Sequence, residues 1–169
     1  MGRITTRHKG SGAKRLLRLI DFKFDKKDIP GKVVSVEYDP NRTAFIGLVV
    51  YNDGEKRYMV LPKNVGAGRE ILISKEAEIL PGNRIPLEKL PPGTFVYSIS
   101  LSAEGKAALV RSAGSFAEIV AQDERCATIK LPSGEIRKVV KNAWASIGQV
   151  SNDEHNLIVI GKAGRSRWM

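Results

Sequence analysis

Basic side chains alternate with small residues at both ends of the chain, a combination that can bind phosphate. Residues 2–15 (GRITTRHKGSGAKR) contribute Arg3, Arg7, His8, Lys9, Lys14 and Arg15, and residues 161–168 (GKAGRSRW) contribute Lys162, Arg165, Arg167 and Trp168. Each Lys or Arg that neutralises a phosphate releases condensed counterions, and Gly and Ser let backbone amides come close to it. A tryptophan ring can also stack on a base. The two ends therefore predict nucleic-acid binding.

The charge of the chain is concentrated in these same ends. Residues 1–27 hold nine Lys or Arg against two Asp, and residues 161–169 hold three Lys or Arg and no acid, which together account for the formal net charge of +10. The 133 residues between them are neutral overall. Solvated tails are the alternative interpretation, because basic tails are common. A sequence pI near 9.9 favours a polyanionic partner.

No motif predicts catalysis, a metal or a cofactor. The glycine-rich KGSGAK (9–14) fails the spacing of a phosphate-binding P-loop, and Arg15 stands where a dinucleotide-binding motif needs its third glycine. His155, in NDEHN, is expected to be a loop residue, and Cys126 a small buried one. The chain has no second cysteine for a disulfide and no apolar stretch of about 18 residues. We therefore expect a soluble intracellular protein with no membrane partner and no small-molecule substrate.

The first half of the body has the two-residue period of β-strands. In KVVSVEYD (32–39), Val34, Val36 and Tyr38 share one face, which we expect to be the buried one. Residues 44–51 and 55–61 flank the turn NDG (52–54) and predict a hairpin. Weaker strands are expected over 69–74 and 83–87. Five short strands in about sixty residues favour a small closed barrel of the OB type.

The second half repeats this pattern after a proline-containing linker (88–94). Strands are expected over 94–101, 115–122, 126–131, 135–140, 145–150 and 157–160, with PSG (132–134) as a tight turn, and together they suit an SH3-like barrel. In the first of them, Phe95, Tyr97, Ile99 and Leu101 share a face. Residues 13–20 (AKRLLRLI) could form a helix, with Leu16, Leu17 and Ile20 on one face, or a strand.

Several longer motifs resemble one known family from end to end. GRITTRHKG (2–10), YDPNRTA (38–44), DGEKRY (53–58), PPGT (91–94), VRSAG (110–114), LPSGEIRK (131–138), NDEH (152–155) and GKAGRSRW (161–168) are similar to the ordered motifs of the bacterial-type large-subunit ribosomal protein L2 family. The resemblance implies a mainly β protein with an OB-fold barrel, an SH3-like barrel and basic extended termini. On this basis we divide the chain into a basic segment (1–27), an OB-fold RNA-binding domain (28–90), an SH3-like domain (91–160) and a basic tail (161–169).

The resemblance also implies a function. It implies a structural, non-enzymatic constituent of the large subunit that binds ribosomal RNA near the peptidyl-transferase centre and supports transfer-RNA binding. It further implies contact with other ribosomal proteins and with small-subunit RNA at an intersubunit bridge, in a cytoplasmic or organellar ribosome. Two arginines of the family implicated in RNA binding fall on Arg42 and Arg111. A free-standing RNA-binding translation or transcription factor of the same architecture is the alternative.

The chain departs from the family pattern in three internal motifs. GSGA (10–13) replaces a Gly-Gly-Gly-His run, residues 97–100 (YSIS) replace His-Asn-x-Glu, and GKAA (105–108) replaces Gly-Lys-Gly-Gly. The family also continues beyond the position of Met169 with an extension that contains its disputed catalytic histidine. No catalytic residue can therefore be carried over to this chain.

Overall fold

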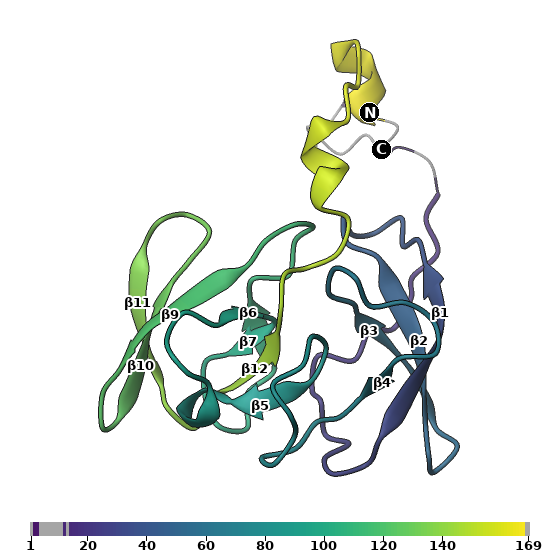
Figure 1. Ribbon diagram of the computed structural model, residues 1–169. Helices are drawn as coiled ribbons and strands as arrows, with labels where there is room; N and C mark the ends of the chain where they lie inside the picture. Colours follow the sequence, from purple (N-terminus) through teal and green to yellow (C-terminus); the bar gives the residue numbers. More distant parts are fainter. Residues whose placement is uncertain (1, 4–11, 13, 168–169) are drawn as a thin grey trace.

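The computed structural model describes residues 2–3, 12 and 14–167, and the chain is mainly β as expected (Figure 1). Twelve strands form a four-stranded sheet, a six-stranded sheet and a two-stranded sheet. The helices of the described part are three short 3₁₀ turns: η1 (Leu87–Lys89), η2 (Asp153–Leu157) and η3 (Ala163–Arg167). None of them is long and apolar enough to cross a membrane.

The first sheet has the order β3-β2-β1-β4. Its strands are β1 (Gly31–Glu37), β2 (Ile46–Tyr51), β3 (Lys56–Val60) and β4 (Glu70–Ile71). Strands β2 and β3 form the predicted hairpin, with Ile46 opposite Val60 and a turn closed by the Gly54 amide on the Tyr51 carbonyl at 2.9 Å. Val33, Val49 and Ile71 form part of the core beneath this sheet.

The predicted buried face of β1 is wrong. Val34, Val36 and Tyr38 are 53%, 44% and 67% exposed, whereas Val33 is fully buried. The pairing with β2 passes from Val33 opposite Val49 directly to Ser35 opposite Leu48, so a bulge at Val34 interrupts the register. Because apolar residues occur on both sides of this strand, alternation alone could not identify the inner face.

The second sheet has the order β11-β10-β9-β6-β12-β5. Its strands are β5 (Arg84–Pro86), β6 (Phe95–Tyr97), β9 (Ala117–Gln122), β10 (Cys126–Lys130), β11 (Ile136–Val140) and β12 (Trp144–Ile147). The strand expected over 83–87 thus forms, but it pairs with β12 through Ile85 and Ala145 and does not join the first sheet. Cys126 opens β10 as expected and is only partly buried. The four-segment division of the chain stays a prediction.

The strand expected over 94–101 is broken into two. Ser98 has a φ of 48° and separates β6 from β7 (Ile99–Ser100), which pairs with β8 (Ala107–Leu109) in the two-stranded sheet. Residues 96–100 are all buried, while Phe95 and Leu101 are exposed, so the expected alternation of faces is wrong. Strand β8 lies in a stretch for which the sequence predicts no strand.

Two segments that were predicted to form regular elements, within residues 13–20 and 157–160, do not form them. Residues 14–19 form neither a helix nor a strand, and Leu16, Leu17 and Leu19 are 69%, 75% and 81% exposed. Residues 157–160 are exposed and form no strand, because Asn152, at a φ of 60°, and η2 turn the chain away from the sheet. A short amphipathic segment without a surface to cover gains too little burial to hold a regular element.

Residues 20–29 form an extended segment between the two larger sheets, which we call the inter-sheet strap (Figure 1). Its backbone forms hydrogen bonds with three other parts of the chain. The Asp21 amide donates to the Tyr58 carbonyl at 2.8 Å, and the Asp28 amide donates to the Ile73 carbonyl at 2.8 Å. The Phe22 carbonyl accepts from the Ala107 amide at 2.8 Å. Phe24 is 5% exposed and belongs to the core under the first sheet. The strap is therefore part of the folded body.

Arg84 joins this strap to the second sheet. Its side chain is almost fully buried, and it donates to the carbonyls of Ser98 at 2.6 Å and Trp144 at 3.2 Å. The guanidinium carbon lies 4.1 Å from the centroid of the Phe24 ring. Burial lowers the pKa of Arg84 to about 9. The cation is held by carbonyl oxygens and an aromatic face without a carboxylate partner among the described residues.

Candidate nucleic-acid interface

Arg42 and Arg111, the two predicted RNA-binding arginines of the body, meet at one aromatic ring. The guanidinium carbon of Arg42 lies 5.6 Å from the centroid of Phe22, and that of Arg111 lies 4.8 Å from it. Phe22 comes from the strap, Arg42 from the loop after β1, and Arg111 from the loop after β8. A cation within about 6 Å of a ring centroid is attracted by the ring quadrupole. The fold thus brings together residues that are distant in sequence.

Asp39 holds Arg42 in a tight turn. The buried Asp39 carboxylate accepts from the Arg42 Nε at 2.6 Å and from the Asn41 amide at 2.9 Å. Burial raises the pKa of this carboxyl, but the hydrogen bonds from Arg42 and Asn41 outweigh it and keep the pKa below its ordinary value. The Arg42 side chain is 21% exposed, and its two terminal nitrogens have no hydrogen-bond partner among the described residues. They are free to meet an outside acceptor.

Arg111 is presented by a loop with unusual backbone geometry. Val110, the residue before it, has a φ of 56°, which is rare for a β-branched side chain, and its carbonyl accepts from Ser98 at 2.8 Å. Gly114 closes the loop at a φ of 67°, where a Cβ would lie 2.9 Å from the Cα of Asp153. Arg111 itself is exposed and forms no ion pair within the described part of the chain.

Hydrogen bonds tie the two arginine loops to each other. The Ala113 amide donates to Thr43 Oγ1 at 3.0 Å, and the Asn152 side-chain amide donates to the Thr43 carbonyl at 2.6 Å. Ser151 Oγ accepts from the Phe45 amide at 3.2 Å. Three distant segments are thereby fixed together, so the spacing of Arg42 and Arg111 does not depend on one loop alone.

One basic residue of the N-terminal segment, Arg15, contacts this site. Arg15 donates to the Pro40 carbonyl at 2.9 Å, and the Asn41 side chain donates to the Leu16 carbonyl at 2.8 Å. Lys14 is exposed next to Arg15, and Arg3 is exposed farther along. Arg7, His8 and Lys9 lie outside the described residues. Of the predicted N-terminal set, the structure therefore places Arg15 beside the Arg42 loop.

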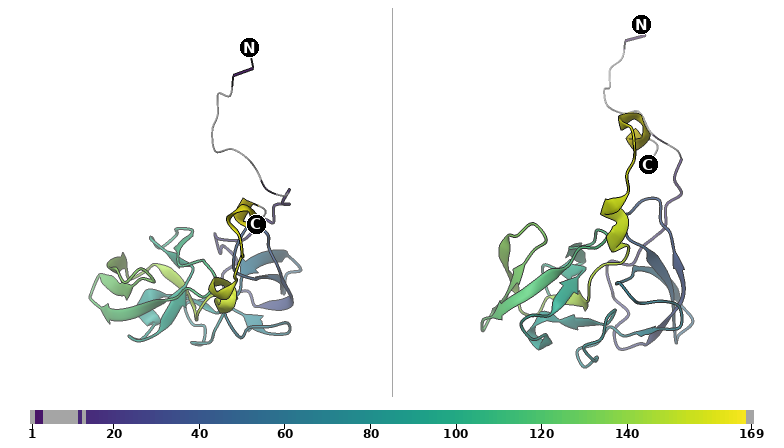
Figure 2. Two further views of the ribbon diagram at one scale, coloured as in Figure 1. Left: turned by 90° about the horizontal axis from the view of Figure 1, so that it is seen from above. Right: turned by 45° about the horizontal axis from the view of Figure 1, so that its top comes forward.

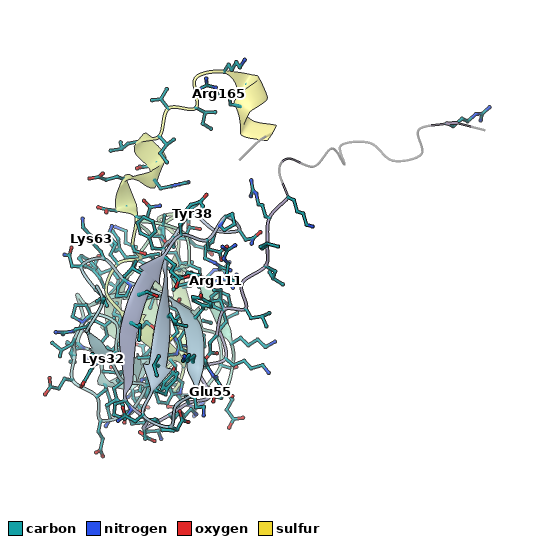
Figure 3. All side chains as sticks on the ribbon, turned by 90° about the vertical axis from the view of Figure 1, so that its right-hand side faces the viewer. Lys32, Tyr38, Glu55, Lys63, Arg111 and Arg165 are labelled. Atoms are coloured by element: carbon teal, nitrogen blue, oxygen red, sulfur yellow. The ribbon has the colours of Figure 1, made fainter. Side chains whose placement is uncertain are left out.

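The basic C-terminal segment leaves the body on the same side. Lys162 and Arg165 are exposed, and the Arg165 amide donates to the Lys162 carbonyl at 3.0 Å. Figure 3 shows Arg165 above Tyr38 and Arg111, and Figure 2 shows the segment rising near the junction of the sheets. The backbone of Arg167 ends η3, while its side chain and Trp168 lie outside the described residues.

Some cations of the first 27 residues are engaged inside the protein. Lys26 pairs with Asp53 at 2.5 Å and also with Glu55, and Lys27 lies 5.1 Å from the Trp144 ring centroid. The acids of the strap are used as well, since Arg57 pairs with Asp21 at 2.8 Å and with Asp25. The cations available to a phosphate are thus a subset of those counted in the sequence.

Phe22 is the residue of this site that sequence reasoning missed. The signal was the pair of phenylalanines in DFKF (21–24), which alternate with polar residues inside the predicted basic segment (1–27). The described part of the chain has no group of three or more His, Cys, Asp or Glu side chains that could hold a metal ion.

Comparison with known proteins identifies the family. The model of the RNA-binding N-terminal domain of ribosomal proteins L2 matches residues 1–73, and that of the C-terminal domain of ribosomal proteins L2 matches residues 80–169. The chain belongs to the ribosomal protein L2 family. The large ribosomal subunit protein uL2 of Methylococcus capsulatus is 51% identical to it over 167 residues, which are 99% of this chain and 61% of that protein.

Membership in the L2 family confirms the expected order of an OB-fold followed by an SH3-like barrel. Phe22 and Arg42 fall in the part matched by the RNA-binding N-terminal domain of L2, and Arg111 falls in the part matched by the L2 C-terminal domain. The site around Phe22 is therefore composed of residues from both L2 domains. The chain spans about three-fifths of the length of its Methylococcus relative.

Proposed function

We propose that this chain is a structural, non-enzymatic constituent of the large ribosomal subunit that binds ribosomal RNA. In this proposal Arg42 and Arg111 bind one stretch of folded RNA from the two sides of the junction between the barrels. The basic residues before residue 19 and after residue 160 extend the contact along the phosphate backbone. The ribosome concerned is the cytoplasmic one.

The arrangement of Arg42, Phe22 and Arg111 carries the proposal. A guanidinium group can bind a phosphate through two parallel hydrogen bonds or stack on a base, which an ammonium group cannot reproduce. The guanidinium groups of both arginines lie over the Phe22 ring, and the loops that carry them are linked by the hydrogen bond between Thr43 and Ala113. Such fixed spacing suits a folded RNA, whose shape is recognised through its backbone and its unpaired bases.

Family membership supports a set of further partners, which are part of the same proposal. We propose contacts with other ribosomal proteins and with small-subunit RNA at an intersubunit bridge, and support of transfer-RNA binding and of the peptidyl-transferase region. The Arg42 and Arg111 site supplies the anchoring on large-subunit RNA. No residue of the chain is assigned a chemical step.

RNA binding is tested with the full chain and a transcript of bacterial large-subunit ribosomal RNA. We expect the affinity to exceed that for an unrelated transcript of equal length, and to fall steeply between 50 and 200 mM salt because several phosphates are neutralised. Equal affinity for both transcripts would contradict the proposal.

Sedimentation of a cell extract separates a ribosomal constituent from a free-standing factor. We expect the chain to travel with the large subunit and to stay there after a moderate salt wash. If it is found mainly in the light fractions, the alternative of a transient RNA-binding factor is the better explanation.

A further inference from the structure

Two exposed phenylalanines form an aromatic pair on the outer face of the second sheet. The ring centroids of Phe95 and Phe116 lie 4.6 Å apart with an interplanar angle of 51°, and the side chains are 48% and 38% exposed. Phe95 starts β6, and Phe116 lies just before β9, its neighbour in the sheet. Covering the exposed part of both rings would remove apolar surface from water, which is favourable.

The pair lines a cavity of about 430 Å³. It is also lined by Gly114 and Ser115, at the end of the Arg111 loop, and by Leu131, Pro132 and Gly134 of the β10–β11 turn. The Ser115 hydroxyl donates to the Ser112 carbonyl at 2.6 Å, which fixes this end of the loop. The cavity is thus continuous with the loop that presents Arg111.

A cross-strand row places two polar groups beside the rings. Phe95 is opposite Glu118, and Glu118 is opposite Lys130, so the three side chains share the outer face. Lys130 is exposed and pairs with no acid of the described chain. The cavity therefore combines an aromatic platform, a hydrogen-bond acceptor and an unpaired cation.

We propose that this cavity receives an unstacked base of the RNA that Arg42 and Arg111 bind, an inference that rests on the proposed function. The base stacks on the Phe95–Phe116 pair, Glu118 accepts a hydrogen bond from an amino group of the base, and Lys130 meets the adjoining phosphate. Unstacked bases of RNA are commonly bound by aromatic side chains in this way. Continuity with the Arg111 loop and the unpaired cation favour RNA over a protein segment as the occupant.

The test uses the full chain, the large-subunit RNA transcript and the double variant Phe95→Leu, Phe116→Leu. Leucine keeps an apolar side chain at both exposed positions, and urea unfolding checks that the fold is retained. We expect affinity for the transcript to fall about tenfold, as for one lost stacked base. The matched control Ile79→Ala changes an exposed apolar side chain outside the cavity and is expected to bind like the wild type.

Irradiation at 254 nm followed by peptide mapping gives a second readout. We expect a covalent RNA adduct on the peptide that holds Phe95 or Phe116, and its loss in the double variant. If Arg111→Ala weakens binding while the double variant binds like the wild type and no adduct forms, the cavity proposal is overturned and the proposed function stands. If the wild type itself shows no preference for the transcript, both fail. Unchanged RNA affinity with reduced incorporation into the subunit would assign the cavity to a protein partner and also overturn the proposal.

Discussion

Thr43 accepts a hydrogen bond from the backbone amide of Ala113 at 3.0 Å, and this bond links the loop of Arg42 to the loop of Arg111. One loop follows a strand of the first sheet and the other follows β8 of the small sheet. The two candidate RNA-binding arginines are therefore held in one rigid unit. Their spacing is fixed before any ligand binds, which lowers the entropic cost of binding.

Removal of either arginine should weaken RNA binding without loss of the fold. We expect Arg42→Ala and Arg111→Ala each to reduce the affinity for large-subunit RNA by about 1–3 kcal/mol, as for a lost charge-assisted hydrogen bond. Filter binding at fixed salt concentration measures the RNA affinity of each variant. Arg125→Ala, at an exposed arginine in the β9–β10 turn, is the control for net charge. Equal affinities of both variants and the wild type would remove Arg42 and Arg111 from the interface.

Phe22 should act through the two arginines. We expect Phe22→Leu to weaken RNA binding and to reduce the additional effect of Arg111→Ala, because the ring no longer orients the guanidinium group. A double-mutant cycle on RNA affinity measures this coupling, which we expect at about 0.5–1 kcal/mol. Strict additivity of the two changes would show that the ring does not position Arg111.

Thr43→Val should loosen the link between the two loops. The substitution keeps the side-chain volume but leaves the Ala113 amide without its acceptor, so we expect a loss of about 0.5–1.5 kcal/mol in the free energy of unfolding. RNA affinity should fall as well, although Thr43 carries no charge. Thr43→Ser keeps the hydroxyl and should restore both values; if it does not, the hydrogen bond is not the cause.

Arg84→Met should destabilise the protein by about 2–4 kcal/mol. The change removes the donor to the buried Ser98 carbonyl and one of the two donors to the Trp144 carbonyl, which keeps the Ser100 hydroxyl, and it removes the cation from the Phe24 ring. Urea denaturation measures the free energy of unfolding. Arg69→Met, at an exposed position, is the matched control, and an Arg84 variant as stable as this control would show that the buried cation contributes nothing net.

Asp39 should contribute a pH-dependent part of the stability. Its pKa in the folded protein lies below the ordinary value of 3.8, so its contribution is fully present above pH 3.8 and is lost as the pH falls through the folded value. We expect the free energy of unfolding to decline on acidification in this window, and to decline less in Asp39→Asn. Urea titrations between pH 2.5 and 6 measure both. Glu124→Gln, at an exposed acid, should decline like the wild type.

The local pattern of the sequence predicted the elements better than their partners. The hairpin of β2 and β3 was predictable because a turn motif separates two apolar runs of similar length. The inner face of β1 was not, because the bulge at Val34 changes the register. The membership of β5 was not predictable either, since its pairing with β12 depends on residues about sixty positions away.

The candidate site was predictable in its cations and not in its architecture. Arg42 was predicted from its place in the family motif YDPNRTA (38–44). The ring that contacts Arg42 and Arg111 lies in the segment that the sequence predicted to be a basic RNA-binding terminus, and the packing of Phe24 in the core shows that this stretch is part of the folded body. Residue type gave the chemistry, while long-range contacts set the geometry.

The inter-sheet strap has a consequence for how the protein unfolds. The strap forms backbone hydrogen bonds with Tyr58 and Ile73 of one half and with Ala107 of the other. The Arg84 guanidinium packs on the Phe24 ring of the strap. Neither half can open fully while this connection holds, so denaturant should melt the whole body in a single cooperative transition. Cleavage within residues 20–29 should shift the midpoint of that transition to lower denaturant.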